Sequence, residues 1–344
     1  MISFLNDYNE LAHPKILQDM LEVQSQANIG YGEDDHSINA QKHIKKVLKN
    51  DDLDIHFIHG GTAANILAIQ SSLRSFDSVI SCDTGHIVGH ENGAIEAIGH
   101  QIIQVKNQDG KLMSDLLSQA LEDNNEEYST NPRLVYLSNA TELGTVYTKK
   151  ELEDISRFCK KNSLYLYMDG ARLGSALASD YCDYTINELV NLVDIFTIGG
   201  TKNGFMFGEA LVITNPDLKL GIRKIIKQRG AMLAKGFALG VQFETMFKDG
   251  LYFSLAEDSI DFAKKLSKAF EDNNIKLYKR QESNLVFPIL NTDLYNRLEK
   301  EFMFEKFQLL DEDKIVARFV TKYSTKKEDI EQLRQRLEDY NARS

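Results

Sequence analysis

Short apolar runs alternate with longer amphipathic stretches along the first two thirds of the chain. Seven of these runs are rich in Val, Ile, Leu, Phe and Tyr, and their length is typical of strands. They lie at residues 55–59, 78–82, 101–105, 133–138, 164–169, 194–199 and 210–214. Apolar residues follow one another directly in these runs, which indicates strands that are buried on both faces.

The segments between these runs carry apolar positions at helical spacing. Residues 64–73 follow a pair of glycines, and residues 149–162 place Leu152, Ile155 and Phe158 on one face. Alternation of strand and helix predicts crossover connections and a mostly parallel sheet that lies between helices. The first part of the chain is therefore expected to be an α/β domain.

The pattern changes after about residue 215. Amphipathic, charged stretches, two short strand candidates and a final helix follow, at residues 217–249, 256–274, 284–290, 314–320 and from about 326. We predict a large α/β domain with a mostly parallel seven-stranded sheet over residues 1–249. A smaller α+β domain is expected over residues 250–344.

Composition narrows the class of protein. The 344 residues carry a net charge of −11, whereas binding nucleic acid needs clustered Lys and Arg. Cys82, Cys159 and Cys182 form no Cys-x-x-Cys pair, so disulfides and a zinc site are not expected and a reducing, cytoplasmic compartment fits. Neither a secretory signal nor an apolar run near the ~20 residues of a membrane span is visible.

Several common nucleotide-binding and catalytic motifs are missing from the sequence. No Gly-x-Gly-x-x-Gly follows a strand, which disfavours a doubly wound oxidoreductase. Walker A, His-Glu-x-x-His and Gly-x-Ser-x-Gly motifs do not occur, and the histidines do not pair at metal-ligand spacing. The candidate chemistry therefore rests on polar residues at the ends of the predicted strands.

Two charged residues follow neighbouring strands. Asp169 ends the run at 164–169, where open α/β sheets bind ligands, although an aspartate before glycine also commonly serves only the turn. Lys202 follows the next run, in a loop of small residues between apolar segments. A lysine near an apolar pocket can form a Schiff base with a carbonyl, whereas an exposed loop lysine is the ordinary alternative.

Two other strand ends offer groups for binding. The segment from Gly60 to Asn65 joins a strand to a helix, and its glycines let backbone N–H groups approach an anion. Thr62 adds a hydroxyl there, but a junction without a ligand would have a similar sequence. His86 follows another strand, where its ring could stack on a flat ligand or belong to an ordinary polar loop.

The order of these features is more informative than any one of them. A phosphate cradle, a stacking residue, an acid and a lysine each follow a strand, and one strand–helix–strand unit of 33 residues (202 − 169) separates Asp169 from Lys202. Pyridoxal phosphate (PLP) needs an anchored phosphate, a held ring, a carboxylate for the ring nitrogen and a lysine for the aldehyde. We therefore predict a PLP enzyme.

Seven segments spread over nearly the whole chain form a familiar set. They are YGEDDHSINAQ (31–41), GGTAAN (60–65), DTGHIVGHENGAIEAIGH (83–100), NATELGTVYT (139–148), MDGARL (168–173), GGTKNGFMFGEA (199–210) and ARFVTKYSTKKEDI (317–330). With them the sequence resembles the L-threonine aldolase and β-eliminating lyase family of PLP enzymes. The resemblance implies the aspartate-aminotransferase type of fold, fold type I.

The resemblance also implies roles around the cofactor. Lys202, next to Thr201, would hold PLP as a Schiff base, and Asp169 would pair with the pyridine nitrogen. His86 would stack on the ring. The residues implied in phosphate binding are Gly61, Thr62 and Ala63.

On the substrate side, the resemblance implies that Arg172 and Arg318 bind the carboxylate, and a forked guanidinium suits this bidentate contact. Tyr31 would be a loop tyrosine that reaches the neighbouring subunit of a homodimer or homotetramer. Asn6 stands where many relatives have serine, and it can still donate a hydrogen bond to a carboxylate.

The base for the substrate's hydroxyl proton is left open. Glu142 stands where some related aldolases have a histidine associated with the β-hydroxyl. Glu142, His86 and a water are the three alternatives.

The implied activity is cleavage of L-threonine, L-allo-threonine and related β-hydroxy-α-amino acids to glycine and an aldehyde. Another PLP-dependent β-elimination or a transamination is the nearest alternative, because one fold serves many reactions. A regulatory protein with a degenerate PLP site is the alternative outside enzymes. No metal ion, nucleic acid or membrane partner is expected.

Overall fold

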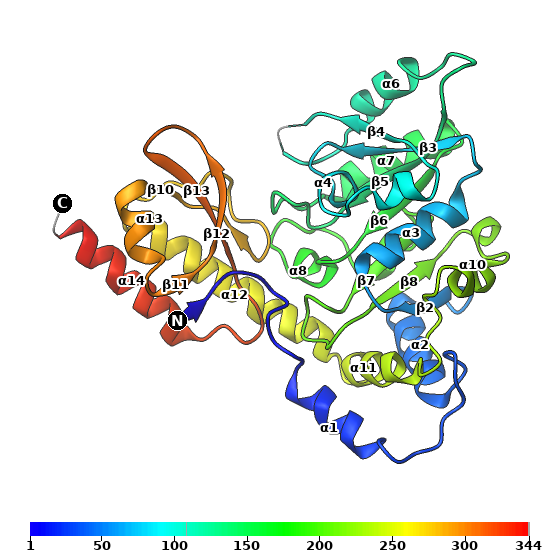
Figure 1. Cartoon of the computed structure of the whole chain (residues 1–344), viewed down its shortest axis with the longest axis horizontal. Helices are drawn as coiled ribbons and strands as arrows, with labels where there is room; N and C mark the ends of the chain where they lie inside the picture. The colour runs from blue at the N-terminus through cyan, green and yellow to red at the C-terminus, as the bar shows by residue number, and fades with distance from the viewer. Residues whose placement is uncertain (108, 343–344) are drawn as a thin grey trace.

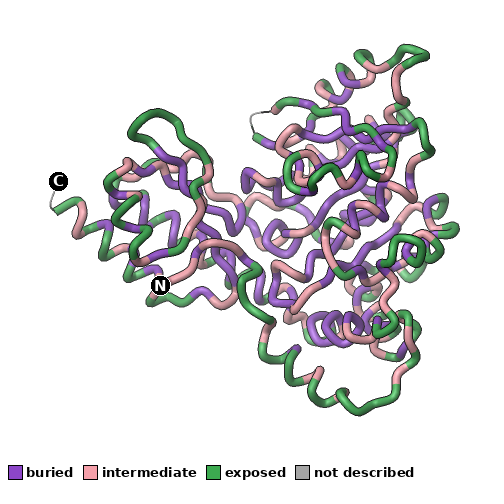
Figure 2. The backbone as a smooth tube through the Cα atoms, viewed as in Figure 1, coloured by how far each residue is buried: buried purple, intermediate pink, exposed green. Residues whose placement is uncertain are grey.

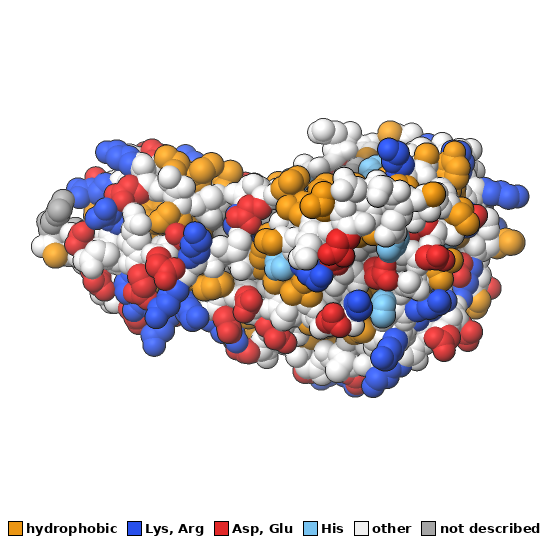
Figure 3. Space-filling view, turned by 90° about the horizontal axis from the view of Figure 1, so that it is seen from below, with side chains coloured by type: hydrophobic (Ala, Val, Ile, Leu, Met, Phe, Trp, Pro, Cys, Tyr) orange, Lys and Arg blue, Asp and Glu red, His pale blue; other side chains and the backbone are white. Residues whose placement is uncertain are grey.

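The computed structural model describes residues 1–107 and 109–342. A large α/β unit and a smaller unit lie side by side, and the long helix α12 (Leu251–Asp272) runs from one to the other (Figure 1). Seen from below, the outline of the molecule narrows between the two units (Figure 3). Basic and acidic side chains are mixed on this face.

The large unit is built on a seven-stranded sheet. From edge to edge its strands are β2 (Asp54–Ile58), β8 (Glu209–Ile213), β7 (Ile195–Gly199), β6 (Tyr165–Asp169), β5 (Asn131–Ser138), β3 (Asp77–Cys82) and β4 (Ile102–Val105). β8 is antiparallel to both neighbours, and the other paired strands are parallel. The mostly parallel sheet and its seven predicted strands are confirmed, with ends that agree within two residues.

Helices cover both faces of this sheet. One face carries α3 (Gly61–Ser72) and α10 (Ile222–Gln228), and the other carries α2 (Asp35–Leu48), α7 (Lys149–Lys161) and α11 (Phe237–Lys248). The other helices of this unit are α1 (Pro14–Glu22), α4 (His86–Gly89), α5 (Ala94–Ala97), α6 (Ser114–Glu122), α8 (Leu173–Leu177), α9 (Ile186–Leu189) and the 3-10 helix η1 (Pro216–Leu218). Within the described residues, no helix is both long and apolar enough to cross a membrane.

Neighbouring residues of a central strand enter different cores. In β5, Leu134 and Tyr136 pack into the core beneath α3, whereas Val135 and Leu137 pack into the core on the opposite face. Every residue of β3, β7 and β8 is buried. Two covered faces explain why these strands are continuous apolar runs. Figure 2 shows these buried strands, and it shows by contrast that α1 is largely exposed.

The smaller unit combines α12 with two further helices and a short antiparallel sheet. Its other elements are β9 (Leu285–Val286), β10 (Ile289–Asn291), α13 (Thr292–Leu298), β12 (Glu305–Leu309), β13 (Lys314–Val320) and α14 (Lys327–Asn341). β13 pairs with β10, β12 and β9. The predicted strand at 314–320 and the final helix are confirmed, and the candidate at 284–290 is divided between β9 and β10. β12 was not predicted from the sequence, because this largely polar edge strand is only partly buried.

The first residues of the chain contribute to the smaller unit. β1 (Ile2–Ser3) pairs in parallel with β11 (Phe302–Met303). The buried ring of Phe4 packs against Phe302 and Phe319, with ring centroids 6.3 and 5.8 Å away. The chain then crosses to the large unit, where the N–H of His13 donates to the carbonyl of Gly204 at 2.7 Å. The division of the chain at residue 249 stays a prediction, and it does not account for this N-terminal strand.

Replacing Phe4 tests how strongly the N-terminal segment stabilises the smaller unit. We expect Phe4→Ala to lower the free energy of unfolding by about 3–5 kcal/mol, because it removes a fully buried aromatic side chain. Urea unfolding followed by far-UV circular dichroism measures the effect. Leu11→Ala is the matched control, since Leu11 is 63% exposed. Equal stability of both variants would contradict the structural role of Phe4.

Candidate active site

One cavity of about 560 Å³ collects most of the residues that the sequence analysis selected. Nine of the twelve line it: Gly61, Thr62, His86, Glu142, Asp169, Arg172, Thr201, Lys202 and Arg318. Asp169, His86 and Lys202 follow the carboxyl ends of parallel strands, which meet at one edge of the sheet. The strands β12 and β13 of the smaller unit add Glu305 and Arg318 to the wall.

Asp169 ends β6 and is held by hydrogen bonds on both carboxylate oxygens. The hydroxyl of Tyr136 and the amide of Asn65 donate to Oδ2, at 2.8 and 3.1 Å. The N–H of Ala171 donates to Oδ1 at 2.9 Å. These donors fix the plane of a carboxylate that is only 6% exposed and faces the cavity.

Lys202 lies in a tight loop between β7 and β8. The N–H groups of Gly200 and Thr201 donate to the carbonyl of Gly208, at 3.0 and 3.1 Å. The N–H of Gly208 donates back to the hydroxyl of Thr201 at 3.0 Å. A Cβ atom on Gly200 would lie 2.6 Å from the Gly208 carbonyl oxygen, so only glycine fits there. The small residues noted in the sequence are thus a packing requirement that holds Lys202 in place.

The N-terminus of α3 opens into the same cavity. Gly60 precedes the helix and provides no side-chain cap, and the first N–H groups of a helix have no partner within it. A Cβ atom on Gly60 or Gly61 would meet no heavy atom within 4 Å, so there is room beside this helix end. Unpaired N–H groups and the helix dipole favour an anion here.

His86 follows β3 and lines the cavity with part of its ring. Its Nδ1 lies 2.8 Å from Oε1 of Glu91, and its side chain is 28% exposed. Burial opposes the charged ring, but the hydrogen bond to Glu91 and the carboxylates of Glu142 and Asp169 outweigh it and raise the pKa of His86. These groups therefore make the protonated form of this ring more stable than it is in a free histidine side chain.

Arg172 is held by a carboxylate that the sequence analysis did not select. Its Nε and Nη2 donate to the two oxygens of Asp7, at 2.8 and 3.1 Å, and both side chains are almost completely buried. Asn284 of the smaller unit also donates to Asp7, at 2.9 Å. Burial opposes the ionised form of Asp7, but Arg172 and Lys202 keep its pKa below the usual value. The edge of Arg172 that remains is Nη1, 4.0 Å from Glu142.

Arg318 is the second arginine of the cavity and comes from β13. It forms an ion pair with Glu305 of the neighbouring strand β12. The Glu305 side chain is 42% exposed, in contrast to the 1% of Asp7. Since an ion pair near solvent contributes only about 0–1 kcal/mol, Glu305 holds its arginine far less firmly than Asp7 does.

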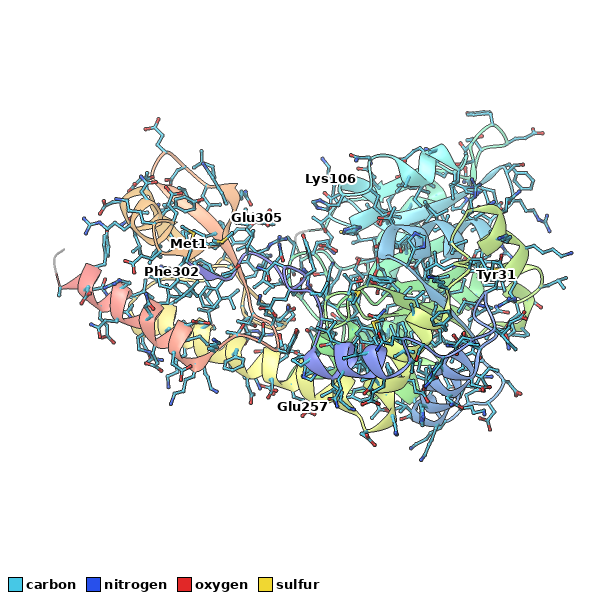
Figure 4. All side chains as sticks on the ribbon, turned by 60° about the horizontal axis from the view of Figure 1, so that its bottom comes forward. Met1, Tyr31, Lys106, Glu257, Phe302 and Glu305 are labelled. Atoms are coloured by element: carbon cyan, nitrogen blue, oxygen red, sulfur yellow. The ribbon has the colours of Figure 1, made fainter. Side chains whose placement is uncertain are left out.

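Three selected residues do not line this cavity. Tyr31 is 47% exposed and lies on the large unit well away from Glu305 (Figure 4), with the amine of Lys227 4.8 Å from its ring centre. Asn6 accepts a hydrogen bond from the N–H of Tyr8, whose side chain lines the cavity in its place. Ala63 packs against the core beneath α3 and could contribute only its N–H group.

Glu209 is a buried acid of the cavity that the sequence analysis also missed. It begins β8, is paired with Gly199, and accepts a hydrogen bond from the N–H of Gly200 at 3.2 Å. Burial raises the pKa of its carboxyl to about 8, and the charge of Asp169 adds to this effect. In the sequence Glu209 is only a polar residue at the edge of an apolar run. The pairing with Gly199 is what places it beside the Lys202 loop, and the sequence alone does not show this pairing.

The described residues fit the parts of the cofactor expected from the sequence. The open N-terminus of α3 suits a phosphate, Asp169 suits a protonated ring nitrogen, and the loop presents Lys202 to the same space. The cavity also has the size of a small-molecule site.

Comparison with known proteins agrees with this geometry. The β-eliminating lyase family matches residues 13–293. The chain belongs to this family. Similar proteins include a low specificity L-threonine aldolase from a Pseudomonas species, which is 32% identical over 75% of both chains. Another, from Pseudomonas aeruginosa, is 31% identical over 80% of both chains.

Solved structures extend the comparison to the fold. A threonine aldolase from Leishmania major superposes with a TM-score of 0.98 at 42% identity, over 99% of this chain and 100% of that one. A histidinol-phosphate aminotransferase from Clostridium acetobutylicum matches with a TM-score of 0.73 at 14% identity, over the whole of both chains, which bears on the fold alone. The predicted fold type I architecture is therefore confirmed.

Glu209 should make stability depend on pH. Its folded pKa of about 8 lies above the usual 4.5, so between these values the folded chain keeps a proton that the unfolded chain has lost. Its contribution to stability is present below pH 4.5 and falls as pH rises to 8, by up to about 1.4 kcal/mol per pH unit. Glu209→Gln removes this loss, so the variant should gain stability relative to the wild type between pH 5 and 8.5.

Thermal unfolding of the ligand-free protein at several pH values measures this difference. Glu257→Gln on α12 is the control, because Glu257 is exposed and should leave the pH dependence unchanged. Parallel stability curves for the wild type and Glu209→Gln would show that Glu209 is ionised throughout.

Proposed function

We propose that this protein is a PLP-dependent aldolase that cleaves L-threonine, L-allo-threonine and related β-hydroxy-α-amino acids to glycine and an aldehyde. The observation that carries the proposal is a single cavity containing Lys202, Asp169, an open helix N-terminus and two arginines. The names of the relatives that match most of the chain support the same reaction.

The chain supplies a distinct group for each part of the cofactor. Lys202 would bind the aldehyde, and Asp169 would accept a hydrogen bond from the protonated ring nitrogen. N–H groups of Gly61 and its neighbours at the N-terminus of α3 would hold the phosphate, with the hydroxyl of Thr62 beside them. When bound, PLP supplies an acceptor for the electrons of the broken Cα–Cβ bond.

The two arginines orient the amino acid in different ways. Arg318 can exchange the partly exposed Glu305 for the substrate carboxylate, because both partners make the same kind of charge-assisted contact. Arg172 stays paired with the buried Asp7 and offers its Nη1 edge. Contacts on two sides of the carboxylate would fix how the substrate's Cα bonds lie in the cavity, and so would select the bond that breaks.

Three groups can take the hydroxyl proton of the substrate. Glu142 and His86 both line the cavity, and Glu142 stands 4.0 Å from Nη1 of Arg172. A water is the third alternative. All three remain within the proposal, since each is compatible with substrate held at Arg172.

A β-elimination is the second candidate reaction, because the family description names it. Transamination would use the same core. A degenerate regulatory protein is disfavoured, since Lys202, Asp169, His86 and both arginines are all retained and face one space.

The proposal includes a homodimer or homotetramer with shared active sites, in the cytoplasm. Large apolar side chains are exposed along α1, the loop to α2 and the first turn of α2, namely Leu17, Leu21, Ile29, Tyr31 and Ile38. A second copy that covers this region would bury them and bring Tyr31 toward a neighbouring cavity. The three cysteines are free thiols, which fits a reducing compartment.

Lys202→Ala tests the cofactor assignment. The wild type reconstituted with PLP should absorb visible light as a lysine-bound cofactor, and the variant should lose this absorption and at least a thousandfold of its activity. Lys106→Ala is the control, because Lys106 is an exposed lysine that does not line the cavity. A wild type that stays colourless after reconstitution would overturn the proposal.

The products distinguish the candidate reactions. We expect acetaldehyde and glycine from L-threonine without an oxo-acid acceptor, measured with a coupled alcohol dehydrogenase assay. Ammonia and pyruvate from L-serine would indicate β-elimination instead. A requirement for an oxo acid would indicate transamination.

A further inference from the structure

A buried carboxylate lies behind the cavity wall, outside the set of residues assigned above. Glu91 follows α4, and its side chain has no exposure to solvent. Its Oε1 accepts from Asn65 Nδ2 at 2.6 Å and lies 2.8 Å from His86 Nδ1. Its Oε2 is buried and has no hydrogen-bond partner among the described residues. An unpaired buried oxygen lowers the stability of the folded protein, so the burial of this acid calls for a functional explanation.

Asn65 joins this carboxylate to the acid of the cavity. Its Nδ2 donates to Glu91 and to Oδ2 of Asp169, and its Oδ1 accepts from the hydroxyl of Tyr167 at 2.6 Å. The two carboxylates can only accept, so the amide nitrogen must face them, which leaves the amide oxygen for Tyr167. Nδ2 of Asn65 therefore has one acceptor for each of its two hydrogens and Oδ1 has one donor, so the orientation of the amide is fixed.

The contact with Glu91 also settles the state of the His86 ring. A carboxylate cannot donate, so Nδ1 of His86 must carry the hydrogen. In the neutral ring Nε2 is then the basic atom, and a proton gained there produces a cation next to Glu91. A carboxylate that holds one nitrogen of a histidine in this way fixes both the tautomer and the ring plane.

We propose that Glu91 is a positioning residue that sets the tautomer of His86 and, through Asn65, ties the stacking ring to the acid Asp169. The inference rests on the proposed function, because it assigns work to the two side chains expected on the face and at the nitrogen of the cofactor ring. Glu91 itself does not line the cavity. It acts only through its two partners.

Several charged groups around His86 contribute to its titration. Glu91, Glu142 and Asp169 favour the charged ring, and Lys202 opposes it. The ring of His90 lies 5.5 Å away, centre to centre. Of these groups, Glu91 alone makes a hydrogen bond to the ring, so its removal should have the largest effect on the tautomer.

The test uses the holoprotein labelled with ¹⁵N-histidine, with the His86 signals identified by their loss in His86→Gln. In the wild type we expect Nδ1–H as the dominant neutral tautomer. Glu91→Gln should move the titration midpoint of His86 to lower pH and mix the tautomers. It should also lower kcat about tenfold or more and shift the pH profile in the same direction. Glu96→Gln is the matched control, because Glu96 is an exposed acid on α5. It should change neither the titration of His86 nor the activity.

A second variant keeps the test decisive if Glu91→Gln does not fold. Glu91→Asp retains the charge but withdraws it by one methylene, so the midpoint should move in the same direction by less. An unchanged midpoint and tautomer in either folded variant would overturn the inference. The proposed function fails separately, if the wild type releases no aldehyde from L-threonine, because the NMR measurement does not depend on turnover.

Discussion

The buried ion pair between Arg172 and Asp7 holds three parts of the chain together. Both side chains are almost inaccessible, and removing one partner of such a pair costs about 3–5 kcal/mol because it leaves a buried charge uncompensated. Asn284 binds the same carboxylate, so the pair connects the N-terminal segment, the start of α8 and the smaller unit. The position of Arg318 relative to Lys202 therefore depends on this contact at the cavity wall.

The acids around the cavity differ because their partners differ. Asp7 is paired with a full positive charge, Asp169 is held by neutral donors, and for Glu209 burial outweighs the hydrogen bonds from Thr201 and Gly200. Glu91 has a histidine and an amide. Separate environments let neighbouring carboxyl groups hold different charges at one pH, which gives each a different chemical use. Several acids can thus lie around one cavity without all of them being negatively charged and repelling one another.

The sequence pattern was sufficient for the sheet and for the residues at its strand ends. Burial on both faces makes each central strand a continuous apolar run, and a residue such as Asp169 or Lys202 that ends the run is easily seen. β12 could not be predicted in this way, because an edge strand exposed to solvent needs no continuous apolar run. Its position is determined by pairing with β13, and the residues of β12 alone do not indicate this pairing.

The missed residues of the site share a physical cause. Asp7 is defined by Arg172, 165 residues away, and Glu91 by Asn65 and His86 on other elements. Glu209 resembles any polar residue at a strand boundary until its pairing with Gly199 is known. Such roles arise only from tertiary contacts, whereas Asp169 and Lys202 could be selected from their places at and after the end of a strand.

The pairing of β1 with β11 also constrains the order in which the protein can be made. Roughly 300 residues separate Ile2 from Phe302, so during synthesis the N-terminal strand leaves the ribosome long before its partner exists. The apolar ring of Phe4 has to stay unpaired while the large unit forms around its own sheet. Closing so long a loop costs little more than closing a shorter one, since the entropy grows only with the logarithm of its length. The smaller unit is therefore completed last, when both ends of the chain are available to a single fold.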